Sequence, residues 1–158
     1  SYAGLGSVEM QSSSGHWVTV GQSASPAEQQ ALDVLRELLP DDGITHAWAN
    51  LTFVSRDGRT SEVDVLLLTR AGLFVVELKG WHGTVTCELT NWTQDTGHSI
   101  RRFGNSYLTA DSKAKKLGTI LGEVADKTPG KPRVPFVRSL VVMHGAGSTV
   151  VVEDAARY

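Results

Sequence analysis

Three polar residues interrupt two otherwise apolar segments near the middle of the chain, namely Asp64, Glu77 and Lys79. A pair of carboxylates can hold a divalent cation that prefers oxygen ligands, and such a cation lowers the pKa of bound water towards neutrality. A lysine beside it can orient that water or offset the charge that develops when a phosphodiester is attacked. These residue types predict metal-dependent phosphodiester hydrolysis, with Mg²⁺ (or Mn²⁺) as the cofactor.

The two segments that carry these residues predict a β-hairpin. Residues 63–69 and 73–79 are strand-like runs joined by the short connection 70–72. Both runs are apolar at consecutive positions, so we expect central strands that are covered on both faces. A two-residue turn at Arg70-Ala71 would place Asp64 directly opposite Glu77, where Cβ atoms lie about 4.5–5.5 Å apart. Two carboxylates at that spacing repel each other unless a cation lies between them.

The same register allows a second interpretation of the hairpin. Glu62 would lie opposite Lys79 and form a cross-strand salt bridge with it. Asp64 and Glu77 would then be ordinary polar residues on a solvated face of the sheet. The apolar residues at the other positions of that face favour a covered site, and both interpretations stay open at this stage.

A helix is predicted to begin at Pro26. Ser25 is a suitable N-cap, Pro26 fits the first helical position and Glu28 falls at the third, which is the arrangement of a capping box. A stripe of apolar residues follows on one face: Ala31, Leu35, Leu38 and Leu39. We expect the Glu28 carboxylate either to cap the helix or to point towards the sheet and take part in catalysis.

Hydrophobic patterning predicts one more helix and several further strands. Strands are expected at residues 16–20, 46–55, 84–88, 99–102, 136–143 and 149–153, and a helix at residues 107–124. This order predicts an α/β domain over residues 21–158, preceded over residues 1–20 by an arm or an edge strand. Because the sequence stops abruptly after Tyr158, we expect it to be a piece of a longer protein.

Composition favours a globular protein of the cytoplasm. Hydrophobic residues make up 41% and charged residues 20% of the 158 positions. No apolar run approaches the roughly 20 residues that span a bilayer, so no membrane partner is expected. The first residues lack a signal-peptide pattern, and the single cysteine, Cys87, cannot form an internal disulfide.

Charge is distributed unevenly along the chain. Residues 1–80 hold 5 Lys and Arg against 10 Asp and Glu, whereas residues 81–158 hold 10 against 7, within a net charge of −2. The acidic half could hold a metal and the basic half could meet the phosphates of DNA. The residues expected to approach the nucleic acid are Lys113, Lys116, Lys131 and Arg133. Ordinary variation of surface charge is the alternative.

The hairpin and its flanks resemble the nuclease-related domain (NERD) family. The resemblance rests on Asp64, on residues 72–79 (GLFVVELK) and on the following Trp81-His82-Gly83, and it extends from about residue 25 to residue 143. The family's pattern is an Asp-bearing apolar strand, then G-[ILV]-[FY]-V-[ILV]-E-[ILV]-K, then an aromatic residue and glycine. NERD domains are a branch of the PD-(D/E)XK nuclease superfamily. The resemblance therefore implies a restriction-endonuclease-like core, with a central mixed sheet, an antiparallel hairpin and flanking helices.

The resemblance also implies roles for individual residues. Asp64, Glu77 and the Leu78 carbonyl would be metal ligands, Lys79 would be the catalytic lysine, and Glu28 would match the family's catalytic glutamate on the first helix. The second helix departs from the family pattern, because Asn105-Ser106 stands where Asn-Pro is usual and Thr109 stands near an expected Gln.

Other short phrases resemble NERD domains at the N-terminus of bacterial defence kinases. They are residues 40–42 (PDD), 47–50 (AWAN), 62–64 (EVD) and 113–115 (KAK), which are most similar to the serine/threonine kinase of phage growth limitation (BREX-like) systems. No H-R-D or D-F-G motif is present, so the kinase would lie outside this sequence. Two functions follow: a DNA endonuclease in an anti-phage defence protein, or an inactive sensor that binds nucleic acid or other defence proteins and regulates the kinase.

Overall fold

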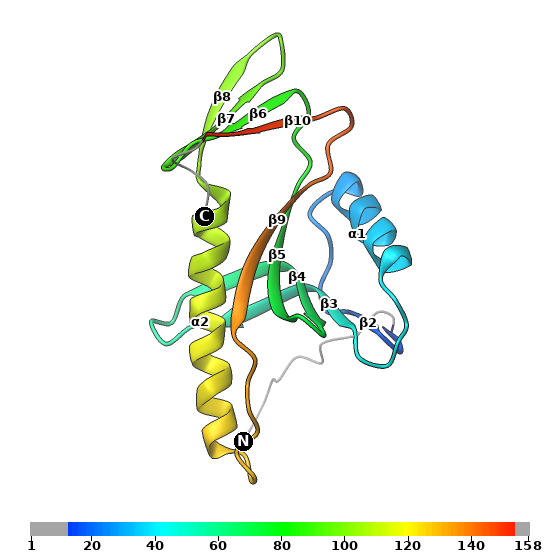
Figure 1. The fold of residues 1–158 in the computed structure, drawn as a ribbon, viewed down its shortest axis with the longest axis vertical. Coiled ribbons are helices and arrows are strands. Elements are labelled where there is room, and N and C mark those ends of the chain that lie inside the picture. Colours follow the sequence, from blue (N-terminus) through cyan, green and yellow to red (C-terminus); the bar gives the residue numbers. More distant parts are fainter. Residues whose placement is uncertain (1–12, 154–158) are drawn as a thin grey trace, which may run out of the picture.

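A six-stranded mixed sheet with one helix on each face forms the centre of the computed structural model, which describes residues 13–153 (Figure 1). The sheet runs in the order β1 (Ser13–Ser14), β2 (Trp17–Thr19), β3 (His46–Val54), β4 (Thr60–Thr69), β5 (Gly72–Lys79) and β9 (Val137–Met143). A second sheet has the order β10 (Thr149–Val152), β6 (Thr84–Cys87), β7 (Asn91–Asp95) and β8 (Ile100–Gly104). The helices are α1 (Pro26–Leu38) and α2 (Ser106–Lys127). The predicted α/β architecture is confirmed.

The first strands attach the beginning of the chain to the main sheet. β2 runs parallel to β3, with Trp17 paired to Ala47, and β1 pairs antiparallel with β2. The strand expected at residues 16–20 is therefore present at the sheet's margin. Residues 1–12 of the expected arm lie outside the described part of the chain.

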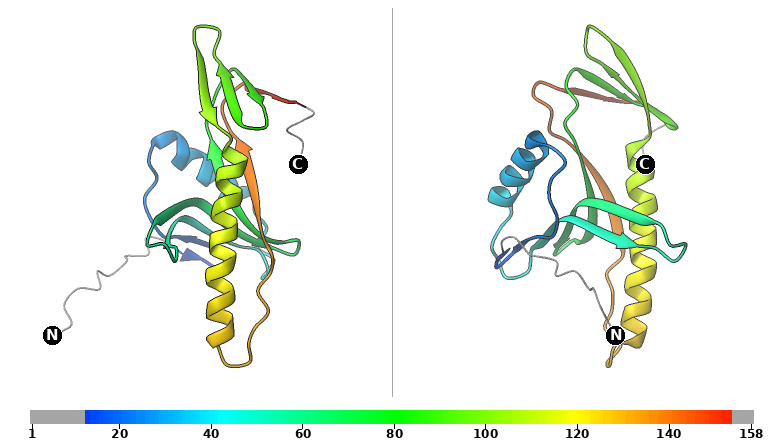
Figure 2. Two further views of the ribbon diagram at one scale, coloured as in Figure 1. Left: turned by 90° about the vertical axis from the view of Figure 1, so that its left-hand side faces the viewer. Right: turned by 180° about the vertical axis from the view of Figure 1, so that it is seen from behind.

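The hairpin of β4 and β5 has the predicted register. Thr69 pairs with Gly72 across the Arg70-Ala71 turn, and the ladder continues inwards as far as Val65 and Val76. β3 pairs with the outer side of β4, and β9 runs parallel to β5 on the other side. The hairpin is therefore central, with α1 packed on one face of the sheet and α2 on the other (Figure 2).

The regular alternation of the sheet breaks where Asn50 of β3 and Asp64 of β4 meet. Ala49 packs into the core beneath α1, whereas Leu51 packs into the core beneath α2. Residues two apart in a regular strand share a face, so one position must interrupt the strand. The β3–β4 ladder omits Asn50 and Asp64, and Asn50 has a φ of 55°, a left-handed conformation in which Asn is enriched. The break takes Asp64 out of the regular ladder.

Both helices begin at the side chains that cap them. The Ser25 hydroxyl accepts a hydrogen bond from the Glu28 N–H, and the Asn105 carboxamide oxygen accepts from the Tyr107 and Leu108 N–H groups. α2 extends three residues beyond the predicted end at residue 124, and its buried face is lined mainly by small residues that let it lie close to β5 and β9. Of the helices in residues 13–153, none is long and apolar enough to cross a membrane.

The second sheet continues directly from the end of β5. Its core consists of Val85, Cys87 and Trp92, against which Trp81 and Tyr107 pack. The sequence did not predict β7, because NWTQD is polar except for its tryptophan. Gly145 lets the β9–β10 connection pass against the β5–β6 connection, since a Cβ there would overlap the carbonyl group of Trp81.

Candidate active site

Glu77 is a buried carboxylate on the α2 side of the main sheet. It lies near the end of β5 and is 6% exposed. Its Oε1 accepts a hydrogen bond of 2.7 Å from Nζ of Lys113 on α2. Burial raises the pKa of Glu77 above its ordinary value, and the negative charge of Asp64 adds to the rise, while Lys113 opposes it. The ion pair therefore compensates a carboxylate that the fold has removed from water.

Asp64 lies where β4 and β5 part. The ladder of the hairpin ends at Val65 and Val76, one pair short of the predicted pairing between Asp64 and Glu77. One oxygen of Asp64 instead accepts a 2.7 Å hydrogen bond from the backbone N–H of Leu78. The structure brings the two carboxylates within electrostatic reach of each other, but Asp64 is held by the backbone of β5 rather than in a directly opposed pair.

Lys79 does not have the partner that strand register predicted. Among the described residues Glu62 and Lys79 form no ion pair, because the ladder that would oppose them ends several residues earlier. The Lys79 Nζ lies 5.7 Å from the ring centre of Trp81, in a cation–π arrangement. The predicted salt bridge is wrong, and the lysine is directed to the aromatic residues after β5.

Glu28 caps the start of α1, and its carboxylate lies within electrostatic reach of Asp64. Its backbone N–H completes the Ser25 cap, and its carboxylate receives a hydrogen bond from the backbone of Ala24. Burial raises its pKa, and the charge of Asp64 raises it further. Glu28, Glu62 and Asp64 line a cleft of about 280 Å³ between α1 and the break in the sheet.

Residues 23–144 match the model of the nuclease-related domain family. This match includes β3, β4, β5, both helices and β9, and with them every residue of the site described above. The chain belongs to the nuclease-related domain family. Asp64 lies on β4, and Glu77 and Lys79 lie on β5, the two strands whose sequences carry the resemblance to the family.

A curated relative of this NERD domain is a much longer protein. The "Probable kinase PglW" of Streptomyces coelicolor is 41% identical over 121 residues, which are 76% of this chain. The chain spans only 8% of that relative's length. No solved structure matches the chain significantly.

The oxygen atoms around Asp64 and Glu77 fit a hard divalent cation. The Leu78 N–H points towards Asp64. Because the N–H and C=O groups of one residue in a strand point to the same side, the Leu78 carbonyl also faces Asp64. The Lys79 carbonyl, by contrast, accepts a bond from His144 on the β9 side. No three His, Cys, Asp or Glu side chains in residues 13–153 are grouped to hold one ion. Two carboxylates, one carbonyl and water are the available ligand set, which suits Mg²⁺.

The four basic residues expected to contact DNA lie in three different places of the NERD domain. Lys113 is paired with Glu77, and Lys116 lies farther along α2, beside Asp57. Lys131 and Arg133 are exposed in the connection from α2 to β9. That connection leads into β9 at Val137, whereas Lys79 pairs with Met143 at the other end of β9, about 20 Å along the strand. The structure does not bring these four residues together.

Neither the pairing of Lys113 with Glu77 nor the positioning role of Asn50 was predicted from the sequence. Lys113 lies three residues after Ala110 and four before Leu117, so helical spacing alone puts it on the buried face of α2. The Asn50 carboxamide donates to the Gly21 carbonyl and the Ser23 hydroxyl, which fixes the segment leading into α1. An asparagine inside an apolar strand was the available signal.

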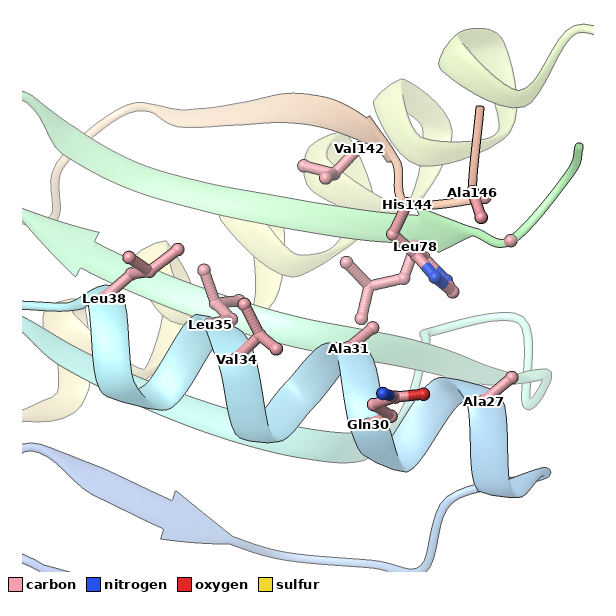
Figure 3. Close-up of a pocket in the computed structure, with 12 residues that line it drawn as sticks. Ala27, Gln30, Ala31, Val34, Leu35, Leu38, Leu78, Val142, His144 and Ala146 are labelled. Carbon is pink, nitrogen blue, oxygen red and sulfur yellow. The ribbon is translucent and has the colours of Figure 1, made fainter. Parts of the chain in front are cut away.

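An apolar groove lies on the α1 face beside the acidic site. It has a volume of about 520 Å³ and is lined along one side by residues of α1, including Val34 and Leu38, and along the other by Leu78 and Val142 (Figure 3). His144 lies at its rim, near Glu28. Its apolar lining does not suit phosphate groups, so the α2 face remains the better candidate for meeting nucleic acid.

Proposed function

We propose that this NERD domain hydrolyses phosphodiester bonds of DNA with Mg²⁺ or Mn²⁺. The observation that carries the proposal is the juxtaposition of two carboxylates, one buried at Glu77 and one hydrogen-bonded to the backbone N–H of Leu78 at Asp64. Burial makes the negative charge of Glu77 costly and the nearby charge of Asp64 adds to that cost, which a cation between the two carboxylates would lower. Membership of the nuclease-related family supports the same chemistry.

Each side chain has a distinct part in the proposed reaction. Asp64, Glu77 and the Leu78 carbonyl hold the cation, which when bound supplies an activated water and neutralises charge on the phosphate. Lys79 orients the water or stabilises the charge that develops on the phosphate oxygens. Glu28, on α1, lies within electrostatic reach of Asp64 and helps to position its carboxylate. Lys113 keeps Glu77 charged and fixed before the cation arrives.

Cleavage of labelled DNA in Mg²⁺ and in Mn²⁺ tests the proposal. Asp64→Asn and Glu77→Gln should each abolish cleavage and weaken Mn²⁺ binding measured by calorimetry. Asp126→Asn is the matched control, because Asp126 is exposed on α2 about 20 Å along the helix from Lys113. A wild-type protein that binds no Mn²⁺ and cuts no DNA would refute the proposal, as would cleavage that survives Asp64→Asn.

A sensor domain without catalysis is the second candidate. It is favoured by the Lys113–Glu77 ion pair, which already neutralises a carboxylate that a metal would use, and by the small number of acidic groups at the site. This candidate predicts that nucleic-acid affinity falls steeply with salt and is unchanged by Glu77→Gln. Loss of affinity in Glu77→Gln at constant Mg²⁺ would count against it.

We also propose that the domain acts inside an anti-phage defence protein. Support comes from the relative named as a probable kinase, of which this chain corresponds to a small fraction. The domain would then provide cleavage, or recognition of foreign DNA, to a kinase elsewhere in the polypeptide and to other defence proteins. Phage plating on cells with the full-length gene, carrying either the native site or Asp64→Asn, tests this role; equal protection by both would exclude a need for the site.

A further inference from the structure

Four side chains lead from the candidate catalytic lysine to the β7–β8 hairpin. They are Lys79, Trp81, Phe103 and Arg101, which we call the inner strip. Lys79 Nζ lies 5.7 Å from the ring centre of Trp81, and the rings of Trp81 and Phe103 stack with centroids 4.3 Å apart and planes inclined by 20°. Trp92 meets Trp81 edge-on at 6.5 Å and fixes it from the core of the second sheet.

Strand register places Arg101 on the same face as these rings. Arg101 pairs with Gln94 and Phe103 pairs with Trp92, and opposed residues of an antiparallel pair share a face. Trp92 and Gln94 are both buried on that face, and the Gln94 amide donates to the His82 carbonyl. Arg101 thus extends the inner strip by one step towards the tip of the hairpin, which projects beyond the main sheet (Figure 2).

The arginines of β8, Arg101 and Arg102, are exposed and form no ion pair within residues 13–153. Because they are consecutive in a strand, they point to opposite faces. Arg101 faces the aromatic residues of the inner strip, whereas Arg102 lies beside Thr93 on the outer face.

This combination of groups is suited to an unpaired nucleic-acid strand. Exposed cations attract backbone phosphates, and half-buried aromatic rings offer faces and edges to unstacked bases, which duplex DNA does not present. We propose that the inner strip binds single-stranded or locally unpaired DNA next to the scissile phosphate. The inference rests on the proposed function for the identity of the substrate, and it adds a preference for unpaired DNA.

Binding and cleavage should be measured separately on the whole chain. Fluorescence anisotropy in EDTA, with a labelled single strand of about 16 nucleotides and the corresponding duplex, reports binding without turnover. Arg101→Ala should weaken single-strand binding and reduce the salt slope by about 0.7. Phe103→Leu should weaken it by about tenfold through lost stacking. Arg102→Ala is the matched control, since it removes the same charge from the next residue on the other face.

The possible results separate the two proposals. The inner strip is supported if Arg101→Ala and Phe103→Leu lose affinity for the single strand while Arg102→Ala keeps it. The protein should also bind the duplex more weakly than the single strand. The proposal is overturned if Arg101→Ala and Arg102→Ala weaken single-strand binding equally, if duplex and single strand bind with equal affinity, or if neither DNA binds. Cleavage in Mn²⁺ that persists unchanged in Arg101→Ala refutes the strip and leaves the nuclease intact. Strip-dependent binding by a protein that never cleaves refutes the nuclease alone.

Discussion

Replacement of Lys113 by methionine isolates the electrostatic role of the ion pair with Glu77. The two charges lie 2.7 Å apart and the Glu77 side chain is 7% exposed. At an effective dielectric constant of about 20 they attract by roughly 6 kcal/mol, part of which offsets their desolvation. Without Lys113 the Glu77 carboxylate can bind a proton instead. Protonating a carboxylate whose ordinary pKa is 4.5 costs about 3.4 kcal/mol at pH 7. We therefore expect the unfolding free energy to fall by about 3 kcal/mol, or Tm by roughly 6–12 °C.

The loss should increase with pH. Burial already raises the pKa of Glu77 in the folded protein, and removal of Lys113 raises it further. Above the unfolded pKa of 4.5 the folded state then binds more protons than the unfolded state, so stability falls as pH rises towards the folded pKa. Below that unfolded value Glu77 is protonated in both states, and the methionine variant should be at least as stable as the native protein.

Urea unfolding between pH 4 and pH 8, followed by tryptophan fluorescence, measures this dependence. Lys115→Met is the control, because its ammonium is 2.8 Å from Asp111 on the same helix but 76% exposed, so only a small change is expected. Adding Glu77→Gln to Lys113→Met should recover most of the lost stability. A loss that is the same at pH 4 and pH 8 would refute the electrostatic argument and indicate a packing defect.

Substitutions at three further positions test how the fold positions the site. Leu32→Ala, at the buried centre of the α1 interface, should lower the unfolding free energy by about 3 kcal/mol in urea. Gly145→Ala should lower Tm markedly and expose Trp81 to acrylamide quenching, because the new Cβ overlaps the Trp81 carbonyl. Asn50→Ala should cost about 1–2 kcal/mol through its positive φ and lost hydrogen bonds, whereas Asn50→Gly, which tolerates the φ, should cost less.

Local patterns predicted the hairpin and the first helix because their determinants are close in sequence. The Arg70-Ala71 turn sets the pairing of Thr69 with Gly72, and Ser25 with Pro26 sets the start of α1. The resemblance to NERD domains correctly identified the family, since the Glu-x-Lys strand carries most of its specific residues. The actual roles of Asp64, Glu77 and Lys79 in metal binding and catalysis stay predictions.

The break in the sheet could not be read from the same patterns. Extending the register past Val65 placed Glu62 opposite Lys79, but β4 and β5 separate at Asp64. Asn50, at the matching place on β3, adopts a left-handed conformation. That conformation depends on bonds to Gly21 and Ser23, which are 29 and 27 residues away in sequence. The partner of Glu77 is similarly distant, 36 residues along the chain on α2. Contacts of this separation are set by the assembled fold rather than by local sequence.

The balance of charge at the site links these long-range contacts to function. The charges of Asp64 and Glu77 are balanced by those of Lys79 and Lys113, while Glu28 and Glu62 of the adjoining cleft add further acidic groups. The two lysines thus offset part of the negative charge, but a site without net positive charge attracts a phosphate weakly. A divalent cation would add two positive charges to the site, which favours a phosphodiester. Nucleic-acid binding at this site should therefore depend on the divalent ion, whereas binding through the exposed Arg101 should persist in EDTA.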